Sequence, residues 1–246
     1  MRGTWSTADI AGHTADVYDP PGPHRPRYAM LYLHGIGLET LVDQPAFTRV
    51  FDELGLACVC PHGGRCWWAD RLCPEFDPQL TPERHLLDNV LPFIRERWGI
   101  APPAIGLLGV SMGGQGALRL AFKHPKLFPA VAGLASAIDH HELYGQGTLL
   151  DEMYDSKEQC RQDTAGMHIH PTEYPPAIFF CIDPADTVWF RGNDRLHEKL
   201  RALGVPHEHD FTTRAGGHSW EYFNHMADRA IRFVCAGLHV AGRRLL

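Results

Sequence analysis

A pentapeptide in the middle of the chain, Gly-Val-Ser-Met-Gly at residues 109–113, constrains the fold more than any other segment. The apolar run before it, 104–108, predicts a short strand that is buried on both faces. After it, residues 112–124 carry apolar side chains at helical spacing, with Pro125 as the stop. We therefore expect a sharp strand-to-helix turn with Ser111 at its apex, flanked by glycines where strand and helix nearly touch.

A serine at such a turn is suited to nucleophilic attack. Its hydroxyl would be exposed, and the free amides and dipole of the following helix would favour developing negative charge. The pattern predicts acyl transfer with Ser111 as the nucleophile. The alternative is a tight turn whose serine only caps the helix. Partner residues decide between the two, because a serine hydroxyl needs a base and a carboxylate to react at neutral pH.

Two later segments offer these partners, each directly after an expected strand. The apolar run 177–182 leads into Asp-Pro-Ala-Asp, and the expected strand 207–211 leads into a glycine-rich loop that presents His218. We expect Asp186 to orient His218, because it lies deeper in its loop than Asp183, which stays an alternative. Nucleophile, acid and histidine in this chain order are typical of α/β-hydrolases and not of chymotrypsin-like or subtilisin-like enzymes.

Strand and helix alternate along most of the chain, which predicts an α/β fold with a mostly parallel sheet and helices on both faces. Residues 4–10 and 13–19 flank Ala-Gly and predict an antiparallel hairpin at a sheet edge. The apolar run 28–34 predicts a central strand that ends in His-Gly-Ile-Gly. Backbone amides there, at Ile36 or Gly37, would join the Met112 amide in holding an oxyanion; a plain glycine-rich turn is the alternative. Further helices are expected at 45–54, 82–98 and 195–203, the second kinked at Pro92, and further strands at 56–60 and 130–135.

The chain of 246 residues, with 44% hydrophobic content, can bury the core of one large α/β domain. The segment 136–176 has little periodicity and is too long for an ordinary connection. We expect either a cap-like excursion over the site, with Tyr144, Tyr154 and Tyr174 as candidate substrate contacts, or a surface insertion. Candidate walls of a substrate pocket are Trp67, Trp68, Trp189 and Trp220, although tryptophan more often packs in the core.

The composition argues against several other classes of protein. A net charge of −6 without a basic block argues against nucleic-acid binding, so small-molecule substrates are expected. The N-terminus lacks the apolar core of a signal peptide and no segment is long enough to span a bilayer, so we expect a cytoplasmic protein that does not bind membranes. Seven cysteines without an export signal predict free thiols. No metal is expected, since Cys60, His62, Cys66 and Cys73 match no familiar zinc spacing.

Four separated segments carry a resemblance to a known family. They are 33–37 (Leu-His-Gly-Ile-Gly), 109–114 (Gly-Val-Ser-Met-Gly-Gly), 183–186 (Asp-Pro-Ala-Asp) and 216–223 (Gly-Gly-His-Ser-Trp-Glu-Tyr-Phe). In them the chain resembles the putative-esterase branch of the α/β-hydrolases, which includes esterase D (S-formylglutathione hydrolase), feruloyl and acetylxylan esterases, and mycolyl transferases. The last segment is the most specific, because Gly-Gly-His-x-Trp before the terminal helix is a mark of this branch.

The resemblance implies a triad of Ser111, Asp186 and His218, with the amides of Ile36 and Met112 as the oxyanion hole. We therefore expect a serine carboxylic ester hydrolase that works through an acyl-enzyme, without a cofactor, on a small-molecule ester. An acyltransferase or thioesterase with the same triad, and a binding protein that kept the fold without the chemistry, are the alternatives. The sequence leaves the oligomeric state and the acyl and alcohol specificity open.

Overall fold

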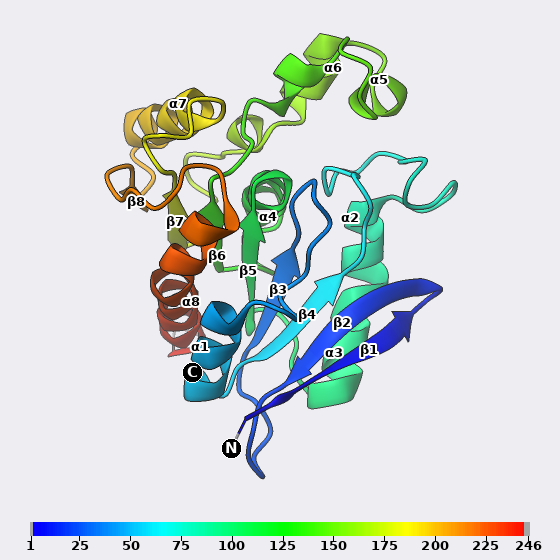
Figure 1. Cartoon of the computed structure of the whole chain (residues 1–246), viewed down its shortest axis with the longest axis vertical. Coiled ribbons are helices and arrows are strands. Elements are labelled where there is room, and N and C mark those ends of the chain that lie inside the picture. The colour runs from blue at the N-terminus through cyan, green and yellow to red at the C-terminus, as the bar shows by residue number, and fades with distance from the viewer. Residues whose placement is uncertain (1, 244–246) are drawn as a thin grey trace.

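A computed structural model describes residues 2–243. Within them, eight strands form one sheet in the order β1-β2-β4-β3-β5-β6-β7-β8 (Figure 1). The strands are β1 (Thr4–Ile10), β2 (His13–Asp19), β3 (Ala29–Leu33), β4 (Ala57–Pro61), β5 (Ile105–Val110), β6 (Ala130–Leu134), β7 (Ala177–Cys181) and β8 (Glu208–Asp210). The helices are α1 (Pro45–Leu54), α2 (Pro82–His85), η1 (Leu86–Val90), α3 (Leu91–Trp98), α4 (Met112–Lys123), η2 (His140–Leu143), α5 (Leu150–Met153), α6 (Lys157–Gln162), η3 (Ala165–Met167), α7 (Phe190–Ala202) and α8 (Trp220–Arg243).

The expected N-terminal hairpin is confirmed at the edge of the sheet. Strands β1 and β2 pair antiparallel from Thr4↔Asp19 to Ile10↔His13. Ala11 (φ 53°) and Gly12 (φ 86°) form the two-residue turn, whose left-handed backbone matches the twist of the strands. Strand β2 also pairs antiparallel with β4, and every later pairing in the sheet is parallel. The predicted α/β class is therefore confirmed.

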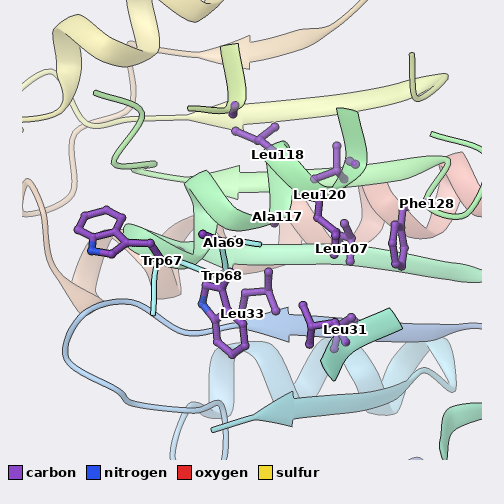
Figure 2. Packing of buried hydrophobic residues seen from close by; sticks show 14 of the residues in the cluster. Leu31, Leu33, Trp67, Trp68, Ala69, Leu107, Ala117, Leu118, Leu120 and Phe128 are labelled. Carbon is purple, nitrogen blue, oxygen red and sulfur yellow. The ribbon is translucent and has the colours of Figure 1, made fainter. Parts of the chain in front are cut away.

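The central strands are buried on both faces, as their continuous apolar runs predict. Leu31 and Leu107 point to a cluster shared with α3, α4 and α7, whereas Met30 and Leu108 point to a cluster shared with α1 and α8. Figure 2 shows the first cluster, in which side chains of β3 and β5 meet those of α4. Burying both faces fixes the register of these strands, because a shift of one residue would exchange the side chains of the two faces.

Helix α4 begins in direct contact with two strand backbones. A Cβ at Gly113 would overlap the Leu33 carbonyl of β3, and one at Gly109 would overlap the Gly113 carbonyl. Only glycine permits this approach, because any side chain would push the helix away from the sheet. The turn at 109–113 is thus as tight as its sequence predicts.

The helical region 82–98 differs from the single kinked helix expected there. It consists of α2, a π-helical turn η1, and α3, so the irregularity precedes Pro92 instead of falling at it. Proline has no amide hydrogen, and the carbonyl four residues earlier therefore lacks its helical partner, which favours a local change of helix type. Thr81 caps the start of α2, since its hydroxyl oxygen accepts from the Arg84 amide at 3.2 Å.

The segment 136–176 contains the short helices η2, α5, α6 and η3, which its weak periodicity did not predict. In Figure 1 it lies at the top of the view, beyond the carboxyl ends of β3 and β5.

Helix α7 also begins earlier than expected, at Phe190 and not at residue 195. The seven cysteines are all free thiols, and none of the helices within residues 2–243 has the length and apolar character needed to cross a bilayer.

Candidate active site

Ser111 stands at the turn between β5 and α4 in a conformation that non-glycine residues rarely adopt, with φ 54° and ψ −118°. Its backbone is held from three sides. The Ser111 amide donates to the Leu134 carbonyl at 2.9 Å, and the Ser111 carbonyl accepts from the amides of Gln115 at 3.1 Å and Ala137 at 3.0 Å. Such strain persists only where the surroundings hold it in place, and functional sites are where it concentrates.

His218 joins Ser111 to a carboxylate. Its Nε2 lies 2.9 Å from the Ser111 Oγ, and its Nδ1 lies 2.6 Å from Oδ2 of Asp186. An ionised carboxylate can only accept, so the proton is on Nδ1 and the lone pair of Nε2 faces the serine hydroxyl. The structure thus brings together three residues that are far apart in the sequence, in the arrangement needed for proton transfer from the serine.

Asp186 is fixed by the start of α7. It is buried, with 3% of its surface exposed, and its Oδ1 accepts from the Trp189 amide at 3.1 Å while Oδ2 faces His218. One carboxylate oxygen therefore anchors the side chain to the helix start and the other orients the imidazole.

Asp183, the alternative acid, has a different set of partners. It is fully buried, and its carboxylate accepts from the amides of Ala185 and Ala215, each at 2.7 Å, and of Gly217 at 2.9 Å. Burial alone would raise the pKa of Asp183, but these backbone donors hold it below its ordinary value. Asp183 thus ties the loop after β7 to the loop that carries His218.

His34, which we did not single out in the sequence, supports the loop beside Ser111. It is 1% exposed, and its Nε2 accepts from the Gly63 amide at 3.0 Å. Since an amide can only donate, Nδ1 bears the proton and donates to the Gly35 carbonyl at 2.8 Å. Trp68 Nε1 donates to the His34 carbonyl at 3.1 Å. Burial lowers the pKa of His34 to about 4, so the ring is neutral.

The two residues predicted to supply oxyanion amides flank the serine. The loop that contains Ile36 passes so close that a Cβ at Gly35 would lie 3.3 Å from the Ser111 Cβ. Met112 is the first residue of α4, where backbone amides have no helical acceptor. The Ile36 side chain is 50% exposed, so this loop also forms part of the surface beside the serine.

The four tryptophans expected to line a pocket divide into two pairs. Trp67 and Trp68 are buried in the core, at 3% and 1% exposure, with Trp67 stacked on His140 at 4.6 Å between ring centroids. Trp189 and Trp220 are partly buried and follow the Asp186 and His218 positions along the chain. Trp67 and Trp68 are therefore part of the core, whereas Trp189 and Trp220 keep some exposed surface close to Asp186 and His218 in the sequence.

One of the three tyrosines named as candidate substrate contacts has an internal partner. Tyr154 is 3% exposed, and its hydroxyl donates to Asp163 at 2.7 Å. Tyr144 and Tyr174 are partly buried against the core. The Tyr154 hydroxyl is thus committed to the internal structure of the segment 136–176.

Comparisons with known proteins place the chain in a family. The profile of the Esterase family, described as "Putative esterase", matches residues 12–233. A search of curated proteins by sequence finds no match. Among solved structures, a ferulic acid esterase superposes with a TM-score of 0.77 at 18% identity, covering 96% of this chain and 100% of that one.

Two further structures have the same fold. The S-formylglutathione hydrolase of Agrobacterium tumefaciens gives a TM-score of 0.78 at 18% identity, covering 96% of this chain and 94% of its own. The fluorophosphonate-binding serine hydrolase F of Staphylococcus aureus gives 0.79 at 15% identity, covering 96% and 99%. Because the family profile spans most of the sequence, the chain belongs to this esterase family and is a serine carboxylic ester hydrolase of the α/β-hydrolase fold.

Proposed function

We propose that Ser111, Asp186 and His218 form the catalytic triad and that the backbone amides of Ile36 and Met112 form the oxyanion hole. The observation that carries this proposal is the continuous hydrogen-bonded chain from the Ser111 Oγ through His218 to Asp186. Each residue type suits its role: a hydroxyl to attack, an imidazole to move the proton, and a carboxylate to hold the imidazole tautomer.

The proposed reaction proceeds through an acyl-enzyme. The Ser111 oxygen bonds to the ester carbonyl carbon while His218 Nε2 takes the hydroxyl proton. The carbonyl oxygen becomes negative and is held by the two amides. The bond to the alcohol oxygen then breaks, and the alcohol leaves with the proton from His218. Water repeats these steps on the acyl-enzyme, which releases the acid and restores Ser111.

We further propose that the segment 136–176 forms one wall of the site within a single α/β-hydrolase domain. Its support is the hydrogen bond from the Ala137 amide to the Ser111 carbonyl, which begins the segment directly behind the serine. A small-molecule ester would enter beside the exposed Ile36 side chain.

We also propose a cytoplasmic location. The free thiols of the chain support it, because thiols persist in a reducing compartment.

Hydrolysis of p-nitrophenyl acetate and butyrate tests the triad. We expect Ser111→Ala to lose turnover by on the order of a millionfold, because no other group replaces the nucleophile. The matched control is Ser6→Ala, which removes an exposed hydroxyl on β1 and should retain the parent rate. A fluorophosphonate probe should label the parent and Ser6→Ala but not Ser111→Ala. Labelling of folded Ser111→Ala at the parent rate would refute the assignment.

The acyl acceptor and the ester class need a separate experiment. A panel of esters graded in acyl length, with S-formylglutathione and feruloyl esters included, measures two preferences: one for the acyl group and one for the alcohol or thiol that leaves. Product analysis in the presence of alcohols, thiols and amines separates hydrolysis from acyl transfer, since only transfer yields a new ester, thioester or amide. We expect free acid as the main product.

A further inference from the structure

Three histidines outside the proposed active site lie together at the β8 edge of the sheet. His197 comes from α7, His207 directly precedes β8, and His209 lies within β8. One potential ligand atom from each lies within 4.8 Å of the other two. The His197 Nδ1 and the His207 Nε2 are 2.9 Å apart, and the ring centroids of His197 and His209 are 3.9 Å apart.

The His207 ring is already in the tautomer that a metal ion requires. Its Nδ1 lies 2.9 Å from the Val205 carbonyl oxygen, which can only accept, so Nδ1 carries the proton. The lone pair of Nε2 is left to face His197. Histidines that bind metals almost always donate their second ring N–H to a carbonyl or carboxylate in this way.

Neighbouring aromatic rings hold the histidines in position. Phe180 of β7 stacks on His207, with ring centroids 5.6 Å apart and planes 15° apart. Phe211 packs edge-on against His209 at 4.9 Å. His209 is exposed and opens the cluster to solvent, whereas His197 and His207 are partly buried. A dissolved ion can therefore reach a set of rings that is largely in place beforehand.

We propose that His197, His207 and His209 bind one divalent transition-metal ion, with Zn²⁺ as the reference case. Tetrahedral Zn²⁺ with Zn–N bonds of about 2.0–2.1 Å places ligand nitrogens about 3.3 Å apart. The separation between His197 and His207 is close to this value, and His209 needs a side-chain rotation to join them. Three imidazoles without a carboxylate favour Zn²⁺, Cu²⁺, Ni²⁺ or Co²⁺ over Mg²⁺ and Ca²⁺.

Metal binding requires one change of tautomer. Without a metal, His197 Nδ1–H donates to the His207 Nε2 lone pair. With a metal, Nδ1 binds the ion and the proton resides on His197 Nε2, which lies 4.0 Å from a carboxylate oxygen of Glu198. No proton is gained or lost by the ring. The fourth position of the metal is left for water.

The ion would cross-link two elements that lead to the proposed active site. Helix α7 starts directly after the loop of Asp186, and β8 leads into the loop of His218. Binding only to the folded chain raises its stability by mass action. We therefore expect the metal to stabilise the protein without taking part in ester chemistry.

The test uses tag-free protein that has been treated with EDTA and exchanged into metal-free buffer. We expect ZnCl₂ titrated in a calorimeter to bind at one ion per chain and to raise the melting temperature, whereas MgCl₂ should do neither. His209→Ala removes the exposed ligand and should weaken zinc binding by at least about tenfold. The matched control His225→Ala removes an exposed histidine on α8 and should bind as the parent does.

His197→Gln provides a second loss of a ligand from a different element, and circular dichroism of each variant verifies that it is folded. Zinc binding by folded His209→Ala and His197→Gln with the parent affinity would overturn the proposal. The absence of stoichiometric binding to the parent protein would overturn it equally. The Co²⁺ complex of the parent should show the visible absorption of a low-coordinate site, and His209→Ala should lose it.

Discussion

Asp183 and Asp186 are three residues apart and have different partners. Asp186 contacts the imidazole of His218, whereas Asp183 contacts backbone amides on two loops. A carboxylate accepts all of these bonds, but an amide side chain must turn an NH₂ group toward some of them. The same Asp→Asn change should therefore have different effects at the two positions.

We expect Asp186→Asn to lower kcat by on the order of 10⁴-fold with little loss of stability, because it removes the carboxylate that holds the His218 tautomer. Asp183→Asn should instead lower the free energy of unfolding by about 1–3 kcal/mol, since buried donors are left unsatisfied. Urea unfolding and p-nitrophenyl butyrate kinetics measure both quantities. A larger loss of kcat in Asp183→Asn than in Asp186→Asn would identify Asp183 as the triad acid.

His34 should make stability depend on pH in the mildly acidic range. The unfolded histidine titrates near 6.5, whereas burial lowers the pKa of folded His34 to about 4. The unfolded chain therefore binds the proton more readily between these values. The contribution of neutral His34, up to about 3 kcal/mol, is fully present above pH 6.5 and is lost as the pH falls toward 4.

The comparison of the parent protein with His34→Asn isolates this effect, because other titrating groups cancel in the difference. Urea unfolding at several pH values between 7.5 and 4 gives the free energy of each protein. The stability gap between them should narrow as the pH falls through this window. A gap that stays constant would show that the pKa of His34 is the same in the folded and the unfolded chain.

At the scale of elements, a buried ion network joins α2, α4 and the segment 136–176. Arg119 of α4 is 2% exposed and pairs with Glu83 of α2 and with Asp163, whose Oδ1 lies 2.7 Å from the Arg119 Nε. Burial alone would raise the pKa of Glu83, but His124, Arg119 and Lys123 hold it at about 2. Both carboxylates therefore stay charged and depend on the guanidinium.

Arg119→Met should lower the free energy of unfolding by about 3–5 kcal/mol, because it leaves the buried carboxylate of Glu83 and the partly buried carboxylate of Asp163 without their main partner. The matched control is Arg84→Met, which removes an exposed pair with Asp88 within one helical stretch and should cost about 0.5 kcal/mol or less. Urea unfolding at pH 7 measures both. Equal losses in the two variants would mean that the buried network contributes no more than a surface pair.

The elements that the sequence predicts best are those with local causes. The hairpin at 4–10 and 13–19 is correct at both ends, because side-chain alternation and a two-residue turn determine it. The early start of α7 could not be predicted in this way. Asn193 there is buried, and its amide donates to the Ser136 carbonyl at 2.7 Å, a contact between distant segments. The polar sequence of 190–194 gives no sign of that burial.

The residues of the site also divide into those that a local sequence motif predicts and those whose role depends on contacts between distant segments. Ser111 and His218 lie in motifs with glycines at fixed offsets, and a pattern of this kind is visible in one sequence. The role of His34 depends on Gly63 and Trp68, which only the fold brings to it. The histidines at 207 and 209 alternate in the sequence, but the third member, His197, approaches them only through the packing of α7.

At the scale of the whole molecule, the sheet order determines where distant residues meet. Strands β5, β6 and β7 are parallel neighbours, so their carboxyl ends lie at one edge of the sheet. Ser111 follows β5, Asp186 follows β7, and His218 follows β8 on the far side of β7. Loops at this edge therefore converge, although Ser111 and His218 are 107 positions apart in the chain.

The backbone carbonyl of Ser111 is shared by α4, through Gln115, and by the segment 136–176, through Ala137. If that segment detaches first in urea, the serine loses one of the restraints on its strained conformation while the sheet is still intact. Esterase activity should then disappear at a lower urea concentration than the far-ultraviolet circular dichroism signal. Urea titrations followed by activity and by circular dichroism measure the difference between the two midpoints. Coincident curves would contradict the prediction. Inactivation of this enzyme would thus precede its denaturation.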